Sequence, residues 1–286
     1  MLAPHFQIVR CGESGLGRFC SMIIPCLLSV RRHPLNASNG RRNCLCPKGH
    51  IGYVASMTKN IIITGASRGI GAAIRTRFGY EDTRIFAVAS KDFDLSTADG
   101  AGDLWEAGLA ALEGRVDILV NNAGVFEENP LTSEEPDWLS GWERTMQINL
   151  TSSALLCRRA VLHWQDRKAE GRIVNIASRA AYRGDSPNHW HYAASKGGMV
   201  AMTKSIARAY AAQGILAYAI CPGFTMTGMA DDYLASRGGD KLLADIPLGR
   251  VAMPEEVAEM VAFCALKAPP SMTGAVLDVN GASYVR

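Results

Sequence analysis

Short, continuously apolar segments alternate with longer helical patterns from Met57 onward, and this alternation is the strongest constraint on the fold. The segments expected to be strands are 61–64, 84–89, 116–120, 172–176, 216–220 and 275–279. The main helical patterns are 142–159, 192–213 and 254–267. The apolar runs lack polar alternation, which is typical of parallel strands covered on both faces. The sequence therefore predicts an α/β fold with a doubly wound parallel sheet and helices on both faces.

The chain of 286 residues is expected to form one folded domain, residues 57–286, preceded by an extension, residues 1–56. The extension holds five of the eight cysteines and seven basic residues against one acid, Glu13. Its net charge of +6 leaves −3 for the rest of a chain whose total is +3. A mildly acidic body argues against a nucleic-acid partner.

Three interpretations of residues 1–56 remain open. A transit peptide fits the excess of arginine, but proline and cysteine interrupt any long amphipathic helix. A signal peptide fits the apolar run 21–30 poorly, because the basic segment 31–34 follows it. That run is also shorter than the ~20 residues that span a bilayer, so no membrane partner is expected. The favoured interpretation is that translation starts at Met57 and that 1–56 is upstream sequence or an unfolded tail.

The cysteines of the body, Cys157, Cys221 and Cys264, are scattered and form no disulfide framework. This favours a reducing compartment, and a cytoplasmic location is expected. Cys44 and Cys46 lack a second ligand pair at a suitable spacing, so no metal site is expected.

A glycine-rich turn, residues 64–71 (TGASRGIG), lies between the first strand and a helix. Gly65 permits a tight turn, Gly69 lets backbone approach a phosphate, and Gly71 lets the helix pack closely on the strand. Such a turn can hold a pyrophosphate against free N–H groups at the helix N-terminus.

Tyr192 and Lys196 are four residues apart, so on a helix their side chains share one face. A cation beside a phenol favours the phenolate and moves its pKa from ~10 towards neutrality. Such a tyrosine can exchange a proton with a carbonyl or alcohol oxygen. In isolation, an ordinary amphipathic helix with an exposed lysine and a half-buried tyrosine explains the pair better, and the rest of the sequence has to decide.

From about residue 59 to 285, the chain resembles the single-domain short-chain dehydrogenases/reductases. The motifs that carry the resemblance, in the family's order, are the turn 64–71, Asn121-Asn122-Ala123-Gly124, Asn149, Ser178, Tyr192-x-x-x-Lys196 and Pro222-Gly223-x-x-x-Thr227. The resemblance implies a Rossmann-type fold and hydride transfer between a nicotinamide dinucleotide and a carbonyl or secondary alcohol.

The resemblance also implies four catalytic roles. Tyr192 would donate or accept the proton, and Ser178 would hydrogen-bond the substrate oxygen. Lys196 would hold the nicotinamide ribose and lower the pKa of Tyr192. Asn149 would position a water that links Lys196 to solvent.

The residues implied to bind the cofactor are Gly65, Ser67, Arg68, Gly69, Ile70, Gly71, Lys91, Asp94, Leu95, Asn121, Ala123, Gly124, Tyr192, Lys196, Pro222, Gly223, Thr225 and Thr227. NADP(H) is expected rather than NAD(H), because the second strand ends without an acid and Arg68 and Lys91 suit a 2′-phosphate. Asp92 leaves NAD(H) open, since a shift of one residue would bring a carboxylate to the ribose.

The segment after the second strand departs from the family pattern. The family places a helix and a third strand before an Asp-Leu pair that touches adenine, but here Asp94-Leu95 follows almost at once. Either this connection is truncated or one edge strand is missing.

Substrate choice is expected to lie in the loops 179–191 and 224–250, the second of which suggests a lid. The C-terminal motifs are similar to the 3-oxoacyl-acyl-carrier-protein reductase branch, which shares them with sugar, alcohol and other ketone dehydrogenases. A non-catalytic dinucleotide-binding scaffold is the alternative from another class. The resemblance also implies a homotetramer or homodimer with a small-molecule substrate.

Overall fold

The computed structural model describes residues 43–45, 51–53, 58–227 and 239–286. The chain divides into two units, Met1–Ala55 and Ser56–Arg286. In the first, β1 (Asn43–Leu45) pairs antiparallel with β2 (Ile51–Tyr53). Apart from these two strands, residues 1–56, to which the three interpretations refer, lie outside the described residues. The suggested lid, 224–250, includes residues 228–238, which are also outside them.

A six-stranded parallel sheet forms the centre of the second unit, as predicted. Its strands, in chain order, are β3 (Lys59–Thr64), β4 (Thr83–Val88), β5 (Ile118–Asn121), β6 (Gly171–Ile176), β7 (Ile215–Pro222) and β8 (Val276–Val279). The spatial order is β4-β3-β5-β6-β7-β8. From β3 the chain first adds β4 on one side, and it then adds β5 to β8 on the other side of β3. Folds of this kind bind ligands where the strand order reverses, at the carboxyl ends of the strands.

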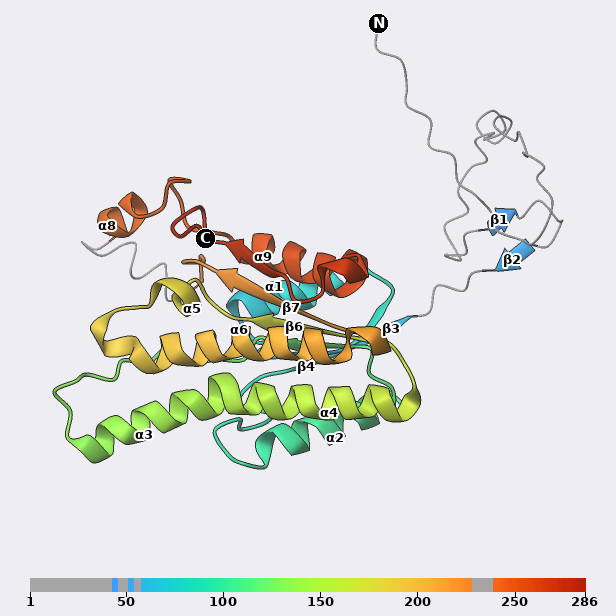
Figure 1. Cartoon of the computed structure of the whole chain (residues 1–286), viewed down its shortest axis with the longest axis horizontal. Coiled ribbons are helices and arrows are strands. Elements are labelled where there is room, and N and C mark those ends of the chain that lie inside the picture. Colours follow the sequence, from blue (N-terminus) through green and yellow to red (C-terminus); the bar gives the residue numbers. More distant parts are fainter. Residues whose placement is uncertain (1–42, 46–50, 54–57, 228–238) are drawn as a thin grey trace, which may run out of the picture. The chain divides into compact units, whose positions relative to one another are not determined.

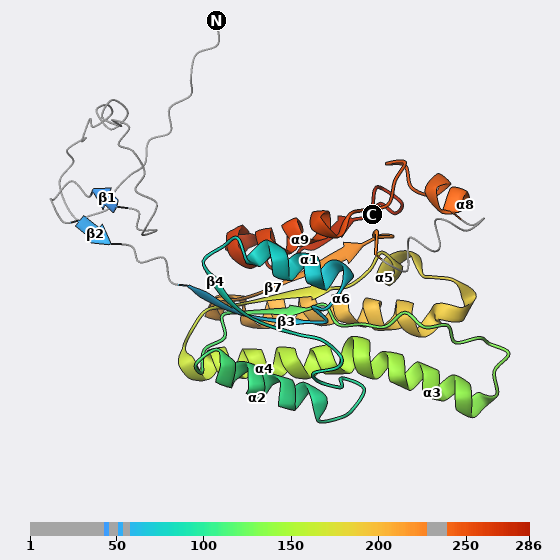
Figure 2. The ribbon, with the colours of Figure 1, turned by 180° about the vertical axis from the view of Figure 1, so that it is seen from behind.

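Helices cover both faces of this sheet (Figures 1 and 2). The α-helices are α1 (Gly69–Phe78), α2 (Gly100–Ala111), α3 (Glu135–Met146), α4 (Ser152–Arg167), α5 (Ala180–Arg183), α6 (Trp190–Tyr210), α8 (Gly239–Ala244) and α9 (Pro254–Ala262). Short π-helical turns are η1 (Gln147–Thr151) and η4 (Phe263–Lys267), and 3₁₀ turns are η2 (Pro187–His189), η3 (Ala211–Gln213) and η5 (Pro270–Met272).

The helix predicted at 142–159 is longer at both ends than expected. It begins at Glu135, with a proline and two acids in its first turn, and η1 joins α3 to α4 without a break. It ends where Lys168 adopts a left-handed conformation, at φ 50°. The sequence pattern missed the first turns because α3 buries only Thr145.

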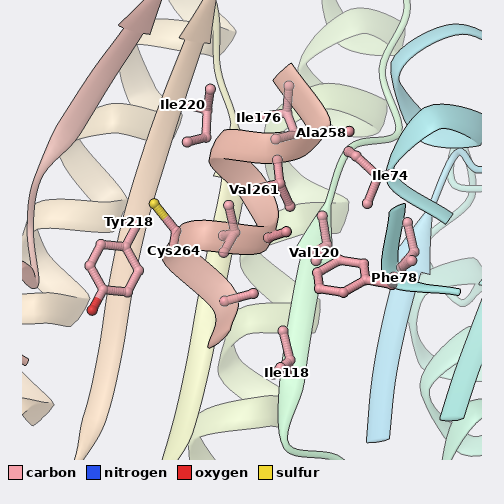
Figure 3. Close-up of a cluster of buried hydrophobic side chains, with 14 of the residues drawn as sticks. Ile74, Phe78, Ile118, Val120, Ile176, Tyr218, Ile220, Ala258, Val261 and Cys264 are labelled. Atoms are coloured by element: carbon pink, nitrogen blue, oxygen red, sulfur yellow. The ribbon is translucent and has the colours of Figure 1, made fainter. Parts of the chain in front are cut away.

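Alternate strand residues face opposite layers, which produces two apolar cores. On one face, Ile61 and Ile63 pack with residues of α1 and α9. Figure 3 shows Phe78 of α1 and Val261 of α9 in this cluster. On the other face, Ile62 packs with α2 and α4 around Trp105 and Trp164. Both faces of β3 are thus inaccessible to solvent, as its continuous apolar run predicted.

The sheet ends at β4, because the fully described stretch between β4 and α2 contains no strand. The third strand and the helix before it, which the family resemblance implies, are both missing from this connection. β4 is therefore an edge strand, and most of its residues are only partly buried. The segment 89–99 that follows it is short and largely exposed.

Candidate active site

The glycine-rich turn connects β3 to α1 at the carboxyl edge of the sheet. Gly65 and Gly69 have φ of 67° and 52°, a region that disfavours other residues. A Cβ on Gly71 would lie 2.0 Å from the carbonyl oxygen of Gly65, so only glycine permits this approach. The tight turn at Gly65 and the close packing at Gly71 agree with the expectation, and the approach of Gly69 to a phosphate stays a prediction.

Asn122, which the sequence interpretation did not single out, supports this turn. Its Nδ2 donates to the carbonyl oxygens of Thr64 and Gly65, at 3.1 and 2.9 Å. The Thr64 hydroxyl accepts the N–H groups of Asn122 and Ala123, at 3.0 and 2.9 Å. The doubled asparagine after β5 is the sequence signal that identifies this support.

Asn121, expected beside the adenosine, has a buried side chain in the interior of the sheet. Its Nδ2 donates to Asn175 Oδ1 at 2.8 Å and to Cys157 Sγ at 3.2 Å. The Asn121 side chain therefore faces the side of the sheet that is covered by α4, which contains Cys157, because neighbouring residues of a strand face opposite sides. Gly124 lies instead at the catalytic residues, where a Cβ would be 3.2 Å from Asn149 Oδ1 and 3.5 Å from Lys196 Nζ.

The start of α1 suits the pyrophosphate of a dinucleotide. Its first turn contains no acid, and its N-cap, Arg68, makes no capping hydrogen bond through its side chain. The first N–H groups of the helix and the positive end of its dipole are thus left to an anion. Ser67 and Arg68 are exposed here, and Ile70 packs against the core beneath.

Asn149 lies in the π-helical turn η1 and is completely buried. Its side chain accepts the N–H of Val125 at 2.8 Å and donates to the Val125 carbonyl oxygen at 3.0 Å. It also donates to Ser195 Oγ at 3.2 Å, and Ser195 in turn donates to the Tyr192 carbonyl oxygen at 2.7 Å. Asn149 thus connects the loop after β5 to α6, and irregular turns of this kind are frequent at functional sites.

Ser178, Tyr192 and Lys196 come together at the carboxyl end of β6. The Ser178 side chain hydrogen-bonds Tyr192. Lys196 Nζ lies 5.7 Å from the centre of the Tyr192 ring and donates to the Ile176 carbonyl oxygen at 2.8 Å. The three side chains that the sequence placed in one site are therefore neighbours, and Lys196 is buried rather than exposed.

The pKa values of this pair differ from expectation. Burial raises the pKa of Tyr192 to about 12, although the hydrogen bond with Ser178 opposes the rise. Burial also lowers the pKa of Lys196 to about 8. The expectation that Lys196 lowers the pKa of Tyr192 is thus not met, because burial is the largest cause of both shifts and Lys196 is not among the groups that shift the pKa of Tyr192.

The segment after β4 exposes its charged side chains. Ser90, Lys91 and Asp92 are exposed, and Asp92 Oδ2 accepts the N–H of Ala89 at 2.9 Å. The Asp92 carboxylate is therefore engaged in its own turn.

The predicted Asp94-Leu95 pair is split between solvent and core. Asp94 Oδ1 accepts both the N–H and the hydroxyl of Ser96, which lowers the Asp94 pKa. Leu95 is buried among the residues under α2 and can offer only its backbone to a ligand.

The residues that follow β7 approach the glycine turn. Thr227 lies beside Gly69, where a Cβ would meet its methyl group at 2.9 Å. Thr225 is buried, donates to the Gly223 carbonyl oxygen at 3.2 Å and forms a bridge with Ala252. Pro222 ends β7, and Gly223 is packed tightly against Asn280. Of these predicted residues, Thr227 is the one that the structure brings to the turn.

An aromatic stack beside Tyr192 was only partly expected. Phe126 is stacked on His189, with ring centres 3.9 Å apart, and lies edge-on to Tyr192 at 4.7 Å. His189 belongs to the polar-aromatic loop that the sequence indicated, whereas Phe126 was missed. Its place two residues after Gly124 is the signal that could have found it. Phe126 is 43% exposed and therefore available to a substrate.

The described part of the chain offers neither a candidate metal site nor a membrane-spanning helix. No group of three or more His, Cys, Asp or Glu residues there could hold a metal ion. Over the same residues, no helix is both long enough and apolar enough to cross a membrane.

Comparisons with known proteins agree with this geometry. A family model described as enoyl-(acyl carrier protein) reductase matches residues 87–282. The 3-oxoacyl-acyl-carrier-protein reductase FabG of Vibrio cholerae is 35% identical over 244 residues, which cover 79% of this chain and 98% of that protein. The Escherichia coli FabG is 33% identical over 248 residues, with the same coverage of 79% and 98%. The 3beta-hydroxysteroid dehydrogenase 1 of Eggerthella lenta is 33% identical over 248 residues, covering 78% of this chain and 92% of its own.

Proposed function

The chain belongs to the short-chain dehydrogenase/reductase family, in its FabG branch, and from this premise we propose that it is an NADP(H)-dependent carbonyl reductase with Tyr192 as its proton donor. At the level of the family, it is an oxidoreductase that acts on CH–OH groups with a nicotinamide dinucleotide. The observation that carries the proposal is the convergence of Ser178, Tyr192 and Lys196.

The proposed reaction needs one proton and one hydride. A bound nicotinamide dinucleotide supplies the hydride to the carbonyl carbon. Tyr192 gives its phenolic proton to the carbonyl oxygen, which becomes the hydroxyl of the product. Ser178 donates a hydrogen bond to the same oxygen and stabilises the charge that develops there. The high pKa of Tyr192 keeps the phenol protonated at neutral pH, as the reduction requires.

Lys196 and Asn149 serve the proton donor. Lys196 is proposed to hold the ribose hydroxyls and to restore the proton to Tyr192, because burial lowers its pKa to about 8, close to neutrality. Both polar atoms of the Asn149 side chain are engaged by Val125 and Ser195. The Asn149 side chain therefore positions the surrounding backbone. We propose that the main chain of Asn149, rather than its side chain, binds the water between Lys196 and solvent.

The preference for NADP(H) rests on the charged residues beside β4. Arg68 and Lys91 are exposed cations on the two turns that meet there, and Ser90 adds a hydroxyl. The one acid that could serve a ribose 2′-OH instead, Asp92, is bonded to the Ala89 N–H. Two cations bind the negatively charged 2′-phosphate of NADP(H) more strongly than they bind the neutral 2′-hydroxyl of NAD(H).

A 3-oxoacyl thioester is the first substrate class to test, since the FabG relatives are named for such a reductase. The Eggerthella lenta relative is named for a hydroxysteroid, so other ketones and sugar lactones are the alternatives. A panel of these substrates, assayed for oxidation of NADPH and NADH, separates them. No turnover of any carbonyl or alcohol, combined with tight dinucleotide binding, would favour the non-catalytic scaffold instead.

Assembly into a homodimer or homotetramer is a further part of the proposal. Exposed apolar side chains lie on α4 and at the start of α6, at Leu162 and Trp190. Contact between copies would remove this surface from water. Light scattering coupled to size exclusion measures the mass, and a monomer at micromolar concentration would contradict assembly. The boundary of the catalytic domain at residue 57 and the cytoplasmic location stay predictions.

A further inference from the structure

Arg179 follows the substrate-binding Ser178 directly, and its charge is buried. Only 9% of the residue is exposed. Its Nη1 is inaccessible to solvent and has no hydrogen-bond partner in the described part of the chain. Burying a guanidinium without satisfying its donors is costly, so this charge needs an explanation beyond folding stability.

The position of Arg179 places its charge where the strands end. Its N–H donates to the Pro222 carbonyl oxygen at 3.0 Å, which joins the loop after β6 to the end of β7. Its guanidinium lies 4.9 Å from the centre of the Phe224 ring. Arg179 and Phe224 are the first residues of the two loops, 179–191 and 224–250, in which substrate choice was expected from the sequence.

The nearest acid compensates this charge only in part. Asp245 Oδ2 is 3.5 Å from Arg179 Nη1 but 2.7 Å from Arg183 Nη1, to which it hydrogen-bonds. One carboxylate, about half exposed, is thus shared between two guanidinium groups. Asp185 is the other acid close enough to act on Arg179, and its Oδ1 accepts the N–H of Ser186.

We propose that Arg179 binds a carboxylate of the substrate, which makes the substrate a short oxo acid or hydroxy acid. This inference rests on the proposed carbonyl reductase, and it replaces the thioester by a free acid. A substrate carboxylate would take the place of Asp245 on Arg179, while Arg183 keeps Asp245. Guanidinium groups favour carboxylates through two parallel N–H···O bonds, and burial strengthens the pair.

The test compares oxo acids with their neutral ethyl esters. The acids are 3-oxobutanoate, 4-oxopentanoate and 5-oxohexanoate, which place the carboxylate progressively further from the carbonyl. The measured quantity is the ratio of kcat/KM for an acid to that for its ester. In the wild-type protein, we expect at least one acid to exceed its ester.

Arg179→Met should lower this ratio about 30-fold or more, since loss of one partner of a buried charge pair costs about 2–5 kcal/mol. Arg179→Lys keeps a charge and should recover part of the ratio. Asp245→Asn should raise the ratio, because it removes the carboxylate that competes for Arg179. Arg183→Gln is the matched control, since it is the other partner of Asp245, and the ratio should change less than with Arg179→Met.

Equal losses for acids and esters in Arg179→Met, or no gain in Asp245→Asn, would show that Arg179 is a structural partner of Asp245 and would overturn the inference. Calorimetric binding of the three acids to the protein with NADP⁺ tests the inference without turnover. Binding that requires Arg179 would support it even if no ketone were reduced, whereas that lack of reduction would contradict the proposed function alone.

Discussion

The proposed catalytic residues around Tyr192 and the segment after β4 both follow the ends of parallel strands, but they are built in opposite ways. Tyr192 and Lys196 are desolvated, and their pKa values are displaced in opposite directions. Lys91 and Asp92 are exposed at the edge of the sheet. The first region has the low dielectric that the proposed proton transfer needs, and the second has the solvated charges that the proposed binding of a 2′-phosphate needs.

This difference has a structural cause. Tyr192 and Lys196 are surrounded by residues from the loop after β5, from η1 and from α6, namely Gly124, Asn149 and Ser195. The segment 89–99 has no further strand beside it, because the sheet ends at β4. Substitutions should therefore have large effects around Tyr192 and small ones beside β4.

Tyr192→Phe should have the largest effect. It removes the proton donor and should lower kcat about 10²–10⁴-fold, with the dissociation constant of the dinucleotide nearly unchanged. Steady-state kinetics and fluorescence titration measure the two quantities. Tyr182→Phe is the control, because its hydroxyl accepts a hydrogen bond from Arg286 instead. Near-normal turnover in Tyr192→Phe would end the proposed mechanism.

Lys196→Met should change how stability depends on pH. The pKa of Lys196 is 10.5 unfolded and about 8 folded, so between these values the unfolded state binds more protons. The free energy of unfolding of the wild type therefore gains about 3 kcal/mol from this group as pH rises from 8 to 10.5. Lys196→Met has no titrating ammonium at this position, so its free energy of unfolding lacks this gain.

Urea unfolding of both proteins at pH 7.5 and pH 10 measures the difference. Any advantage of Lys196→Met at pH 7.5 should shrink at pH 10. Tyr192 titrates in both proteins, so its own contribution largely cancels. A constant difference between the two pH values would mean that Lys196 is not desolvated in the folded state.

Lys91→Glu should have a moderate and selective effect. Loss of a cation and gain of an acid beside the 2′-phosphate should weaken NADPH binding about 10- to 100-fold and leave NADH binding little changed. Asp92→Asn is the matched control, because that carboxylate bonds the Ala89 N–H. An unchanged ratio of NADPH to NADH affinity in Lys91→Glu would refute the proposed preference.

Arg84→Gln should have the smallest effect. Arg84 forms an ion pair with Glu113 at 2.7 Å, and both side chains are more than half exposed. Such pairs contribute about 0–1 kcal/mol to stability. Thermal unfolding should show a small loss that salt reduces further, and a loss above about 2 kcal/mol would show that the β4 edge is more constrained than its exposure indicates.

Much of the fold could be predicted because local signals agree with the final structure. The run 61–63 is apolar throughout, and it lies in an interior strand of the sheet with both faces covered. The turn 64–71 requires positive φ at Gly65 and Gly69, which other residues adopt with difficulty. The glycine spacing alone could therefore predict a tight turn there, of the kind that can bind a phosphate. The early Asp94-Leu95 pair likewise indicated the lost edge strand.

Other features depend on contacts between distant segments and could not be predicted. The sequence offered two adjacent asparagines, and only the packing of distant segments decides which one supports the glycine turn: Asn122 bonds Gly65, whereas Asn121 bonds Asn175 in the interior. The stack of Phe126 on His189 joins residues 63 positions apart. Burial, which raises the pKa of Tyr192 where the sequence led us to expect a lower one, is a property of the packed fold.

The sequence by itself determined the kind of sheet, the order of its motifs and the family's catalytic residues, because apolar periodicity, glycine conformations and motif spacing are local properties. Only the tertiary structure decided which side chains are desolvated and which acids are already bonded. Asp92 and Asp245 look alike as single letters, but one bonds its own backbone turn and the other is shared between Arg179 and Arg183. Dielectric environment and competition for hydrogen bonds arise only when distant segments pack together.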